Sequence, residues 1–545
     1  MSFDPILSES RIAATRAAGH WPDRLIVDYL DRCIATAPDK LAIVDTNSMT
    51  GETTRLSYRE LGRRVERIAL NLAALGVERN DVVSYQLPNW WQFTALHLAC
   101  VRIGAVTNPL MPIFRERELT FMLGLAESKL LIVPRTFRGF DYPAMAKDLR
   151  GALPHLRHVL VVGGEGEDSF ERLLDAPPKQ CDAQALFAAR RPRPDDVTEL
   201  LYTSGTTGEP KGVMHTANTL LSNIIPYAER LGLGPREVVL MASPMAHQTG
   251  FMYGLMMPIV LQASAVLQDI WDPVAAAERI ARERVTFTMA STPFLSDLTE
   301  TVGKGGHEVP SLRIFLAAGA PIPRVLVSRA RQVLGAHIVS AWGMTENGAC
   351  TTTRLDDPED KATSTDGCAL PGMEVRVVDS AGRPLPPGQE GTLKVRGCSD
   401  FVGYLKRPEW YGHDAEGWFD TGDLARMDED GYIRITGRSK DIIIRGGENI
   451  PVVEVEGLLF RHPDIQAAAI VGMPDPRLGE RACAFIVPKP GARLDPGQIL
   501  AFLAEQKLAR QYLPERIEIV DDLPRTPSGK VQKFKLRDIA AKFAA

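Results

Sequence analysis

Short apolar runs alternate with helical patterns along most of this chain of 545 residues. Leu130–Val133 and Val238–Met241 have the length and the aliphatic composition of buried strands. Residues 58–75 place apolar side chains at the spacing of an amphipathic helix, and the hydroxyls of Ser57 and Thr216 are suited to cap helices that begin just after them. Because strands and helices alternate, the sequence predicts an α/β fold.

Length and composition narrow the class of protein. A chain of 545 residues exceeds one ordinary hydrophobic core, so we expect at least two domains. No apolar run approaches the roughly 18 residues that a membrane-spanning helix needs, and residues 1–5 lack the pattern of a secretory signal. We therefore expect a cytoplasmic protein without a membrane span.

The charge of the chain argues against a nucleic-acid-binding protein, and its cysteine content argues against a cysteine metal site. The formal net charge is −5 and Lys and Arg form no dense block, which argues against nucleic-acid binding. The seven cysteines are scattered without a CxxC pair, which suits a reducing compartment and offers no metal-site spacing.

One loop points to nucleotide chemistry: residues 202–212 read Tyr-Thr-Ser-Gly-Thr-Thr-Gly-Glu-Pro-Lys-Gly. Hydroxyl donors, glycines that let backbone N–H groups converge on an anion, and one lysine together predict a polyphosphate cradle, and hence ATP binding. The candidate phosphate-binding residues are Thr203, Ser204, Gly205, Thr206, Thr207, Gly208 and Lys211.

This loop is not a Walker loop. Pro210 precedes Lys211 and Gly212 follows it, so the magnesium-binding hydroxyl that comes after the Walker lysine is missing. A P-loop NTPase is therefore disfavoured. The alternative is a plain surface turn rich in glycine and threonine, which the ordered ending Pro-Lys-Gly makes less attractive.

Five further segments follow this loop along the chain. They are Ala-Ala-Gly-Ala-Pro at 317–321, Trp-Gly-Met-Thr-Glu at 342–346, Phe-Asp-Thr-Gly-Asp at 419–423, Gly-Arg-Ser-Lys-Asp at 437–441 and Pro-Arg-Thr-Pro-Ser-Gly-Lys at 524–530. With the loop at 202–212, they resemble the motifs of the adenylate-forming superfamily, which includes acyl-CoA synthetases, aryl-CoA ligases, luciferases and peptide-synthetase adenylation domains.

The resemblance implies an architecture. Residues 1–438 would form a large N-terminal AMP-binding domain of two α/β subdomains plus a small β-barrel. Residues 439–545 would form a mobile α+β C-terminal cap that turns about a hinge at Lys440. A change in the pattern of elements after Gly437 agrees with this boundary.

The resemblance also implies catalytic residues. Lys530 would bridge the attacking carboxylate and the α-phosphate of ATP, Thr345 would bind the α-phosphate, and Glu346 would hold Mg²⁺. Asp423, rather than Asp420, would bind the ribose hydroxyls, because one carboxylate can accept two hydroxyl donors. From the residues alone, a solvated lysine and a plain Thr-Gly-Asp turn remain the alternatives.

Other parts of the nucleotide site follow in the same way. Arg438 would lie near the ribose or the α-phosphate, with a surface salt bridge as the alternative. The resemblance places two short strips beside the adenine and the phosphates: Gly319, Ala320 and Pro321, and Trp342, Gly343 and Met344.

For a second half-reaction with coenzyme A, Gly446 and Gly447 match the glycines beside the pantetheine tunnel of the family. Any Cβ there would narrow such a tunnel. A hairpin turn at 445–449 explains the same residues almost as well.

His247 and Gln248 match the segment of the family that enters the acyl pocket. Amino-acid adenylating relatives carry an aspartate there for the substrate ammonium, so amino-acid substrates are disfavoured here. His247 could gate the pocket or be a satisfied core histidine. The sequence as a whole most resembles cyclohexanecarboxylate-CoA ligases and short- to medium-chain acyl-CoA ligases.

The resemblance thus implies an ATP-, Mg²⁺- and coenzyme A-dependent acid-thiol ligase that releases AMP and pyrophosphate. Two alternatives stay open: an acyl-AMP ligase that loads a separate carrier protein, and a non-catalytic nucleotide-binding protein. The second would be expected to lose Lys530 or Glu346, and both are present.

Overall fold

The fold is built around two large β-sheets. The computed structural model describes residues 3–177, 182–203, 209–319, 322–439, 441–445, 448–506, 508, 512–526 and 529–543. The larger sheet has nine strands. In spatial order they are β17 (Cys368–Ala369), β16 (Gly348–Thr352), β15 (His337–Met344), β14 (Ile314–Ala317), β13 (Phe287–Ala290), β11 (Val238–Met241), β12 (Ser264–Gln268), β1 (Leu41–Thr46) and β2 (Thr53–Ser57). The strands from β15 to β1 run parallel, and the pairs at both edges are antiparallel.

The second sheet has six strands. In spatial order they are β10 (Lys211–Thr216), β9 (Val197–Thr203), β4 (Val106–Pro109), β3 (Val82–Tyr85), β5 (Leu130–Pro134) and β8 (His158–Val162). Only β10 is antiparallel to its neighbour. A separate small ribbon pairs β6 (Thr136–Phe137) with β7 (Phe140–Asp141). The strands expected at 130–133 and 238–241 are confirmed as β5 and β11.

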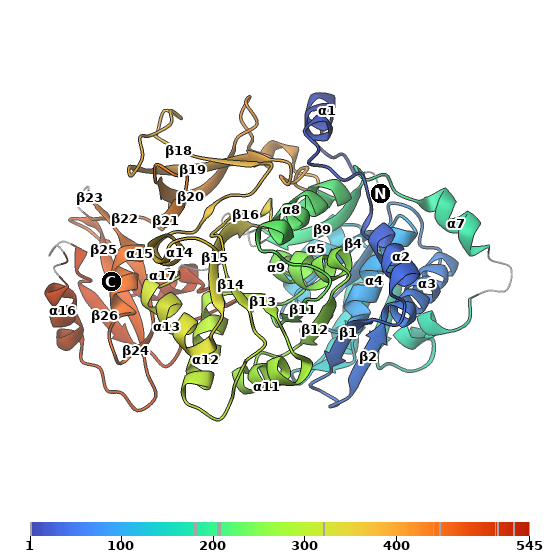
Figure 1. Cartoon of the computed structure of the whole chain (residues 1–545), viewed down its shortest axis with the longest axis horizontal. Coiled ribbons are helices and arrows are strands. Elements are labelled where there is room, and N and C mark those ends of the chain that lie inside the picture. Colours follow the sequence, from blue (N-terminus) through green and yellow to red (C-terminus); the bar gives the residue numbers. More distant parts are fainter. Residues whose placement is uncertain are drawn as a thin grey trace.

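Helices accompany both sheets (Figure 1). They are α1 (Glu9–Ala17), α2 (Ile26–Thr36), α3 (Tyr58–Ala74), α4 (Trp91–Arg102), α5 (Glu116–Leu125), α6 (Tyr142–Ala152), α7 (Ala183–Arg190), α8 (Ala217–Arg230), α9 (Gln248–Gly250), α10 (Met257–Leu261), α11 (Pro273–Glu283), α12 (Thr292–Gly303), α13 (Arg324–Leu334) and α14 (Glu359–Ser364). A π-helix, η3 (Phe251–Met256), joins α9 to α10, and short 3₁₀ turns lie at η1 (Gly166–Asp168), η2 (Phe170–Leu174) and η4 (Pro408–Trp410).

The two predicted helix caps are present. The Ser57 hydroxyl accepts from the backbone N–H of Glu60, whose carboxylate accepts from the backbone N–H of Ser57, and this capping box begins α3. Thr216 caps α8 through the N–H of Thr219. Both hydroxyls satisfy donors that the first turn of a helix cannot pair internally.

The main core lies between the two large sheets. Every residue of η3 is buried there, and so are all residues of α4 except Gln92 and Arg102. The rings of His97 on α4 and Phe251 on η3 meet edge to face with centroids 4.7 Å apart. The side-chain amide of Asn89 donates to three carbonyls of the larger sheet region, those of Met241, Ser243 and Gln268. These contacts fix the two sheets against each other.

A third, antiparallel sheet has the order β18 (Met373–Val378), β19 (Glu390–Gly397), β20 (Phe419–Met427) and β21 (Ile433–Arg438). It corresponds to the small barrel expected from the sequence. In the described residues no ladder joins its outer strands β18 and β21.

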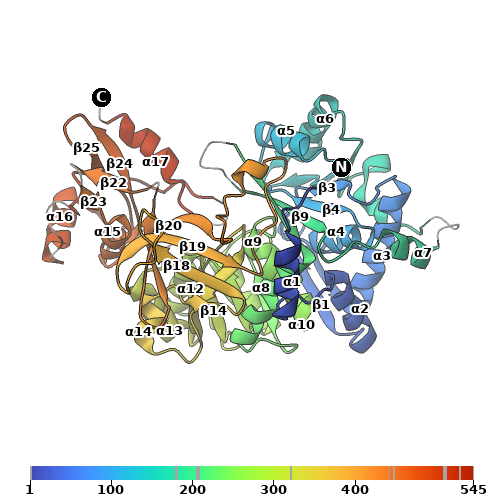
Figure 2. The ribbon, with the colours of Figure 1, turned by 90° about the horizontal axis from the view of Figure 1, so that it is seen from above.

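The C-terminal part is a small α+β unit with its own core, at one end of the molecule in Figure 2. Its strands are β22 (Ile443–Arg445), β23 (Glu448–Ile450), β24 (Ile465–Asp475), β25 (Gly479–Pro488) and β26 (Arg516–Ile519), and its helices are α15 (Val452–Leu459), α16 (Pro496–Glu505) and α17 (Lys533–Ala541). Alternate residues of β24 face opposite ways, so α15 and α16 cover one face of the sheet and α17 covers the other.

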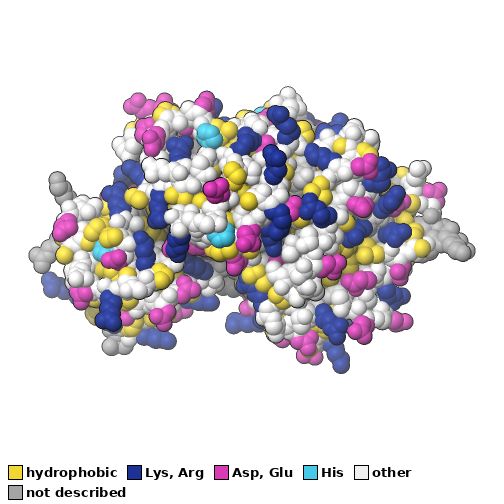
Figure 3. Space-filling model, turned by 60° about the horizontal axis from the view of Figure 1, so that its bottom comes forward, with side chains coloured by type: hydrophobic (Ala, Val, Ile, Leu, Met, Phe, Trp, Pro, Cys, Tyr) yellow, Lys and Arg dark blue, Asp and Glu magenta, His cyan; other side chains and the backbone are white. Residues whose placement is uncertain are grey.

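No helix within the described ranges is both long enough and apolar enough to cross a bilayer. On the face drawn in Figure 3, basic and acidic side chains are interspersed.

Ser57→Ala should lower the free energy of unfolding by about 1 kcal/mol, because an N–H at the start of α3 loses its acceptor. Urea denaturation followed by circular dichroism measures the change. Thr120→Ala is the matched control, since that exposed hydroxyl only bonds back to the carbonyl of Glu116 within α5. An equal loss in both variants would contradict the capping role.

Candidate functional site

The predicted site residues that are described come from several parts of the chain and converge on Asp423. Asp423 lies on β20 and is 5% exposed. The indole Nε1 of Trp342, on β15, donates to its Oδ2 at 2.8 Å, and Nε of Arg438, at the end of β21, donates to its Oδ1 at 2.9 Å. Asp420 is exposed and accepts from the N–H of Gly422 in the turn, so Asp423 is the carboxylate that faces Trp342.

The turn after β15 presents Thr345 and Glu346. Gly343 allows this turn, because a Cβ there would lie 2.0 Å from the carbonyl oxygen of Gly348. The N–H of Met344 donates to Oδ1 of Asn347 at 3.3 Å, which closes the turn. His215 donates from Nε2 to the Thr345 carbonyl at 2.8 Å, so the backbone of this turn is fixed from β10.

Glu346 is a buried carboxyl group, 6% exposed. The Tyr404 hydroxyl donates to its Oε1 at 2.7 Å. Burial raises the pKa of Glu346, while the Tyr404 hydrogen bond and the charges of Lys211 and Arg438 oppose the rise.

This arrangement fits a Mg²⁺ site that relies on the nucleotide. No group of three His, Cys, Asp or Glu side chains in the described part of the chain could hold a metal ion by itself. Mg²⁺ is commonly bound by one or two carboxylates together with substrate phosphates and waters, and Glu346 can supply the one carboxylate.

Lys211 begins β10 directly opposite Thr203 on β9. Its ammonium group lies 4.9 Å from the ring centroid of Tyr404 and 5.2 Å from that of Trp410. The loop residues predicted between these strands, Ser204, Gly205, Thr206, Thr207 and Gly208, lie outside the described residues.

Lys530 reaches the same region from the C-terminal unit. Its N–H donates to the Thr526 hydroxyl at 3.0 Å, and its carbonyl accepts from the N–H of Thr526 at 2.7 Å. The preceding Gly529 has a φ of +84°, and a Cβ there would lie 2.6 Å from the Ser291 hydroxyl. Close packing against the N-terminal part therefore requires glycine at this position.

Several charged side chains of the N-terminal part act on Lys530 electrostatically. The residue keeps solvent access, but protein atoms surround its ammonium group. This desolvation, followed by the charge of Arg438, lowers the pKa of Lys530 to about 8, against the opposing charges of Asp423, Asp441 and Glu346. The structure thus brings Lys530, Asp423, Arg438 and Glu346 together.

The adenine strip is described only in part. Gly319 follows β14, has a φ of +80°, and has open space where a Cβ would project. Ala320 and Pro321 lie outside the described residues, as do Lys440, Gly446 and Gly447 of the predicted hinge and tunnel.

His247 precedes α9 and is partly buried. Its Nδ1 accepts from the N–H of Thr249 at 3.3 Å. Burial, followed by the charge of Lys530, lowers the pKa of His247 to about 4, so the imidazole is neutral at pH 7. Both sequence interpretations of His247 therefore stay open, although its location within the field of Lys530 favours the pocket.

Gln248 lies beside a buried carboxyl group that the sequence analysis missed. Glu199, on β9, is fully buried, and neither its oxygens nor the amide atoms of Gln248 have a hydrogen-bond partner of ordinary geometry. Burial raises the pKa of Glu199 to about 8, and the nearby Gln248 amide opposes the rise. In sequence, Glu199 is the only charged residue of strand β9, and it belongs to no motif.

Tyr404 and Trp410 are two further residues that the sequence did not single out. They lie in the segment between β19 and β20, and no spacing links them to Lys211 or Glu346. Only the tertiary structure places them in the site.

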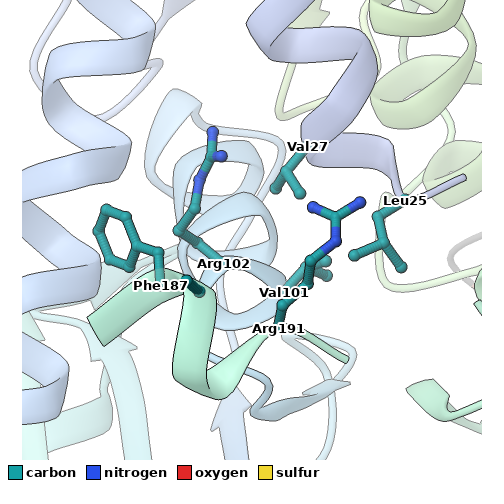
Figure 4. A pocket seen from close by; sticks show the side chains of 7 residues that line it. Leu25, Val27, Val101, Arg102, Phe187 and Arg191 are labelled. Atoms are coloured by element: carbon teal, nitrogen blue, oxygen red, sulfur yellow. The ribbon is translucent and has the colours of Figure 1, made fainter. Parts of the chain in front are cut away.

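A small pocket of about 130 Å³ lies apart from this site, between α2, α4 and α7 (Figure 4). Its arginines are already engaged: Arg102 donates to Asp31 and Arg191 to Asp28. None of the candidate site residues lines this pocket.

Glu199 should make stability depend on pH. The folded protein keeps the carboxyl protonated to about pH 8, whereas the unfolded chain ionises near the ordinary value of 4.5, so stability falls as pH rises between these values. Glu199→Gln removes this loss, which reaches on the order of 5 kcal/mol. The variant should match the wild type near pH 4.5 and be the more stable protein near pH 8.

Urea denaturation at several pH values measures this difference. Glu456→Gln is the control, because Glu456 is also buried but pairs with Lys533 at 2.7 Å. That variant should lose stability at neutral pH. If the free energy of unfolding of wild type and of Glu199→Gln changed with pH in the same way, the protonated state of Glu199 would be contradicted.

Comparison with known proteins places this site in a family. Residues 30–405 match the family model described as AMP-binding enzyme, and residues 454–530 match AMP-binding enzyme C-terminal domain. The chain is 39% identical over 533 residues to a medium-chain fatty-acid–CoA ligase of Escherichia coli K12, covering 97% of this chain and 93% of the relative.

Two other similarities extend over nearly the whole chain. It is 34% identical over 536 residues to a 2,3-dihydroxybenzoate-AMP ligase of Bacillus subtilis, covering 96% of this chain and 95% of the relative. The crystal structure of ATP-bound MatB from Rhodopseudomonas palustris superposes with a TM-score of 0.82 at 28% identity, covering 96% of this chain and 100% of that chain. The chain therefore belongs to the AMP-binding enzyme family and is an adenylate-forming enzyme of the acyl-CoA synthetase type.

Proposed function

We propose that this protein is an ATP-dependent carboxylate–CoA ligase, which forms an acyl-adenylate and then an acyl-CoA thioester, with release of pyrophosphate and AMP. The observation that carries the proposal is the position of Lys530: a loop of the C-terminal unit brings it beside Asp423, Arg438 and Glu346 of the N-terminal part.

The first half-reaction needs positive charge at one place. The carboxylate oxygen attacks the α-phosphorus of ATP, the bond to the pyrophosphate oxygen breaks, and negative charge builds on the phosphate oxygens. Lys530 would bridge the carboxylate and the α-phosphate, Thr345 would donate to the α-phosphate, and Arg438 would add a fixed charge. Asp423 would accept from the ribose hydroxyls.

The remaining nucleotide contacts complete this site. Lys211 and the loop at 203–208 would bind the outer phosphates, Gly319–Pro321 and Trp342–Met344 would line the adenine and phosphate path, and Glu346 would hold Mg²⁺. Bound Mg²⁺ would neutralise charge on the phosphates.

For thioester formation the C-terminal unit, from about residue 439, would turn about Lys440 and withdraw Lys530. Coenzyme A would then approach along Gly446 and Gly447. The thiolate would attack the acyl carbon and AMP would leave.

The acid is proposed to be apolar: alicyclic and similar to cyclohexanecarboxylate, or a short- to medium-chain acid. His247 and Gln248 would border the acyl pocket. Glu199 is a buried carboxyl near Gln248, but burial keeps it protonated at neutral pH, so it offers no charge to a substrate ammonium. The name of the Escherichia coli relative supports an aliphatic acid.

A second candidate is an acyl-AMP ligase that loads a separate carrier protein, because one similar protein is named as an AMP ligase. The deciding experiment incubates purified protein with Mg·ATP and a panel of carboxylic acids, with and without coenzyme A, and detects products by mass spectrometry. Thioester and AMP that require coenzyme A support the proposal. Adenylate without thioester favours the carrier-loading alternative, and no AMP with any acid contradicts both.

Lys530→Ala should lower the rate of adenylate formation by on the order of a hundredfold, since one fixed donor to the developing charge is lost. Pyrophosphate release measures the rate. Lys535→Ala, an exposed lysine on α17, serves as the control and should leave the rate unchanged. A normal rate in Lys530→Ala would remove this residue from the proposed mechanism.

The pH profile gives an independent test of Lys530. Because its pKa in the free enzyme is about 8, kcat/KM for adenylate formation should fall as pH rises through 8 and the ammonium loses its proton. Lys530→Arg should move this fall to higher pH, because a guanidinium stays charged. An unchanged alkaline limb in that variant would contradict the assignment.

A further inference from the structure

Tyr404 connects Lys211 to Glu346, and a second aromatic side chain, Trp410, contacts Lys211. The Tyr404 hydroxyl donates to the Glu346 carboxylate at 2.7 Å, and the Tyr404 ring lies 4.9 Å from the Lys211 ammonium. The Trp410 ring lies 5.2 Å from the same ammonium. Tyr404 is 4% exposed, so both contacts are largely shielded from water.

The segment that carries these rings, residues 400–411, is held along its length. The N–H of Phe401 donates to the carbonyl of Glu346 at 2.7 Å. Residues 402, 403 and 405 exchange backbone hydrogen bonds with β10, the strand that Lys211 begins. Gly403 has a φ of +127°, a conformation that other residues rarely adopt, and it directs Tyr404 inward.

The N-terminal residues support the other side of this segment. Arg11 donates to the carbonyl oxygens of Asp400 and Phe401 and to the Tyr411 hydroxyl. The N–H of Ile6 donates to the carbonyl of Val402 at 2.7 Å. The backbone next to Tyr404 is therefore held from two sides, by β10 and by the N-terminal residues.

Aromatic faces suit a lysine that must bind an anion. The ring quadrupole attracts an ammonium group but takes none of its three donors as a carboxylate would. No carboxylate within the described residues forms an ion pair with Lys211. Within the described residues its N–H groups can therefore turn toward phosphate oxygens, while the two ring contacts restrict the position of the side chain.

We propose that Tyr404 and Trp410 are positioning residues that hold Lys211 and Glu346 as one unit for the phosphates of a Mg-nucleotide. Tyr404 orients the Glu346 carboxylate and supports Lys211, whereas Trp410 acts on Lys211 alone. The inference rests on the proposed function, because it takes Glu346 as the magnesium-binding carboxylate.

The two roles can be separated by two variants. Tyr404→Phe keeps the ring beneath Lys211 and removes the hydroxyl from Glu346, whereas Trp410→Leu removes one ring and leaves Glu346 untouched. Tyr142→Phe is the matched control: this tyrosine is buried like Tyr404, and its hydroxyl donates to the carbonyl of Pro112 at 2.8 Å, a bond that involves neither Lys211 nor Glu346. Circular dichroism and melting temperature check folding.

Calorimetric titration of the whole protein with a non-hydrolysable ATP analogue, with Mg²⁺ and with EDTA, gives the readout without any turnover. Tyr404→Phe should weaken binding about tenfold in Mg²⁺ and less than about twofold in EDTA, as expected for a lost hydrogen bond to a charged group. Trp410→Leu should weaken binding about threefold in both conditions, the effect of one cation–π contact. In both variants KM for ATP should rise more than KM for the acid.

Equal effects of Tyr404→Phe with and without Mg²⁺, or effects no larger than those of Tyr142→Phe, would overturn the inference. So would a parallel rise in KM for ATP and acid, which indicates general loss of structure. A wild-type protein that binds the Mg-nucleotide but forms no thioester would leave this inference intact and refute the proposed function. A wild-type protein without nucleotide binding would refute both.

Discussion

The carboxylate of Asp423 joins three parts of the chain that are distant in sequence. It accepts from Trp342 of the nine-stranded sheet and from Arg438 at the end of the small sheet, and it contributes to the field around Lys530 of the C-terminal unit. A buried carboxylate is tolerated only when donors replace the water that it has lost. These two donors therefore link β15 and β21 to β20 at one carboxylate, in addition to the backbone ladder between β20 and β21.

The fold follows from local patterns to a large extent. The apolar runs at 130–133 and 238–241 are strands, and Ser57 and Thr216 cap helices, because each pattern depends on neighbours within a few residues. Some motif residues meet: Trp342 and Arg438 donate to Asp423, whose charge acts on Lys530. Their roles toward a nucleotide stay predictions.

The missed residues depend on contacts that no spacing encodes. Tyr404 reaches Glu346 across 58 positions of sequence, and it does so only because residues 402–405 pair with β10. Glu199 belongs to a strand whose first five residues are buried, so its sequence context indicates a core position and says nothing of a carboxyl group beside Gln248. The acid substrate is equally hidden from the sequence, because the shape of a binding pocket depends on tertiary packing.

The contacts of the N-terminal residues show that the working unit is larger than the region with recognisable motifs. The family match begins at residue 30, yet Ile6 and Arg11 hold the segment that presents Tyr404 and Trp410. A shortened chain that starts at the family boundary would keep every motif residue and lose this support. Changes in the first dozen residues would then alter the affinity for nucleotide through the segment that carries Tyr404 and Trp410, even where the motifs are identical.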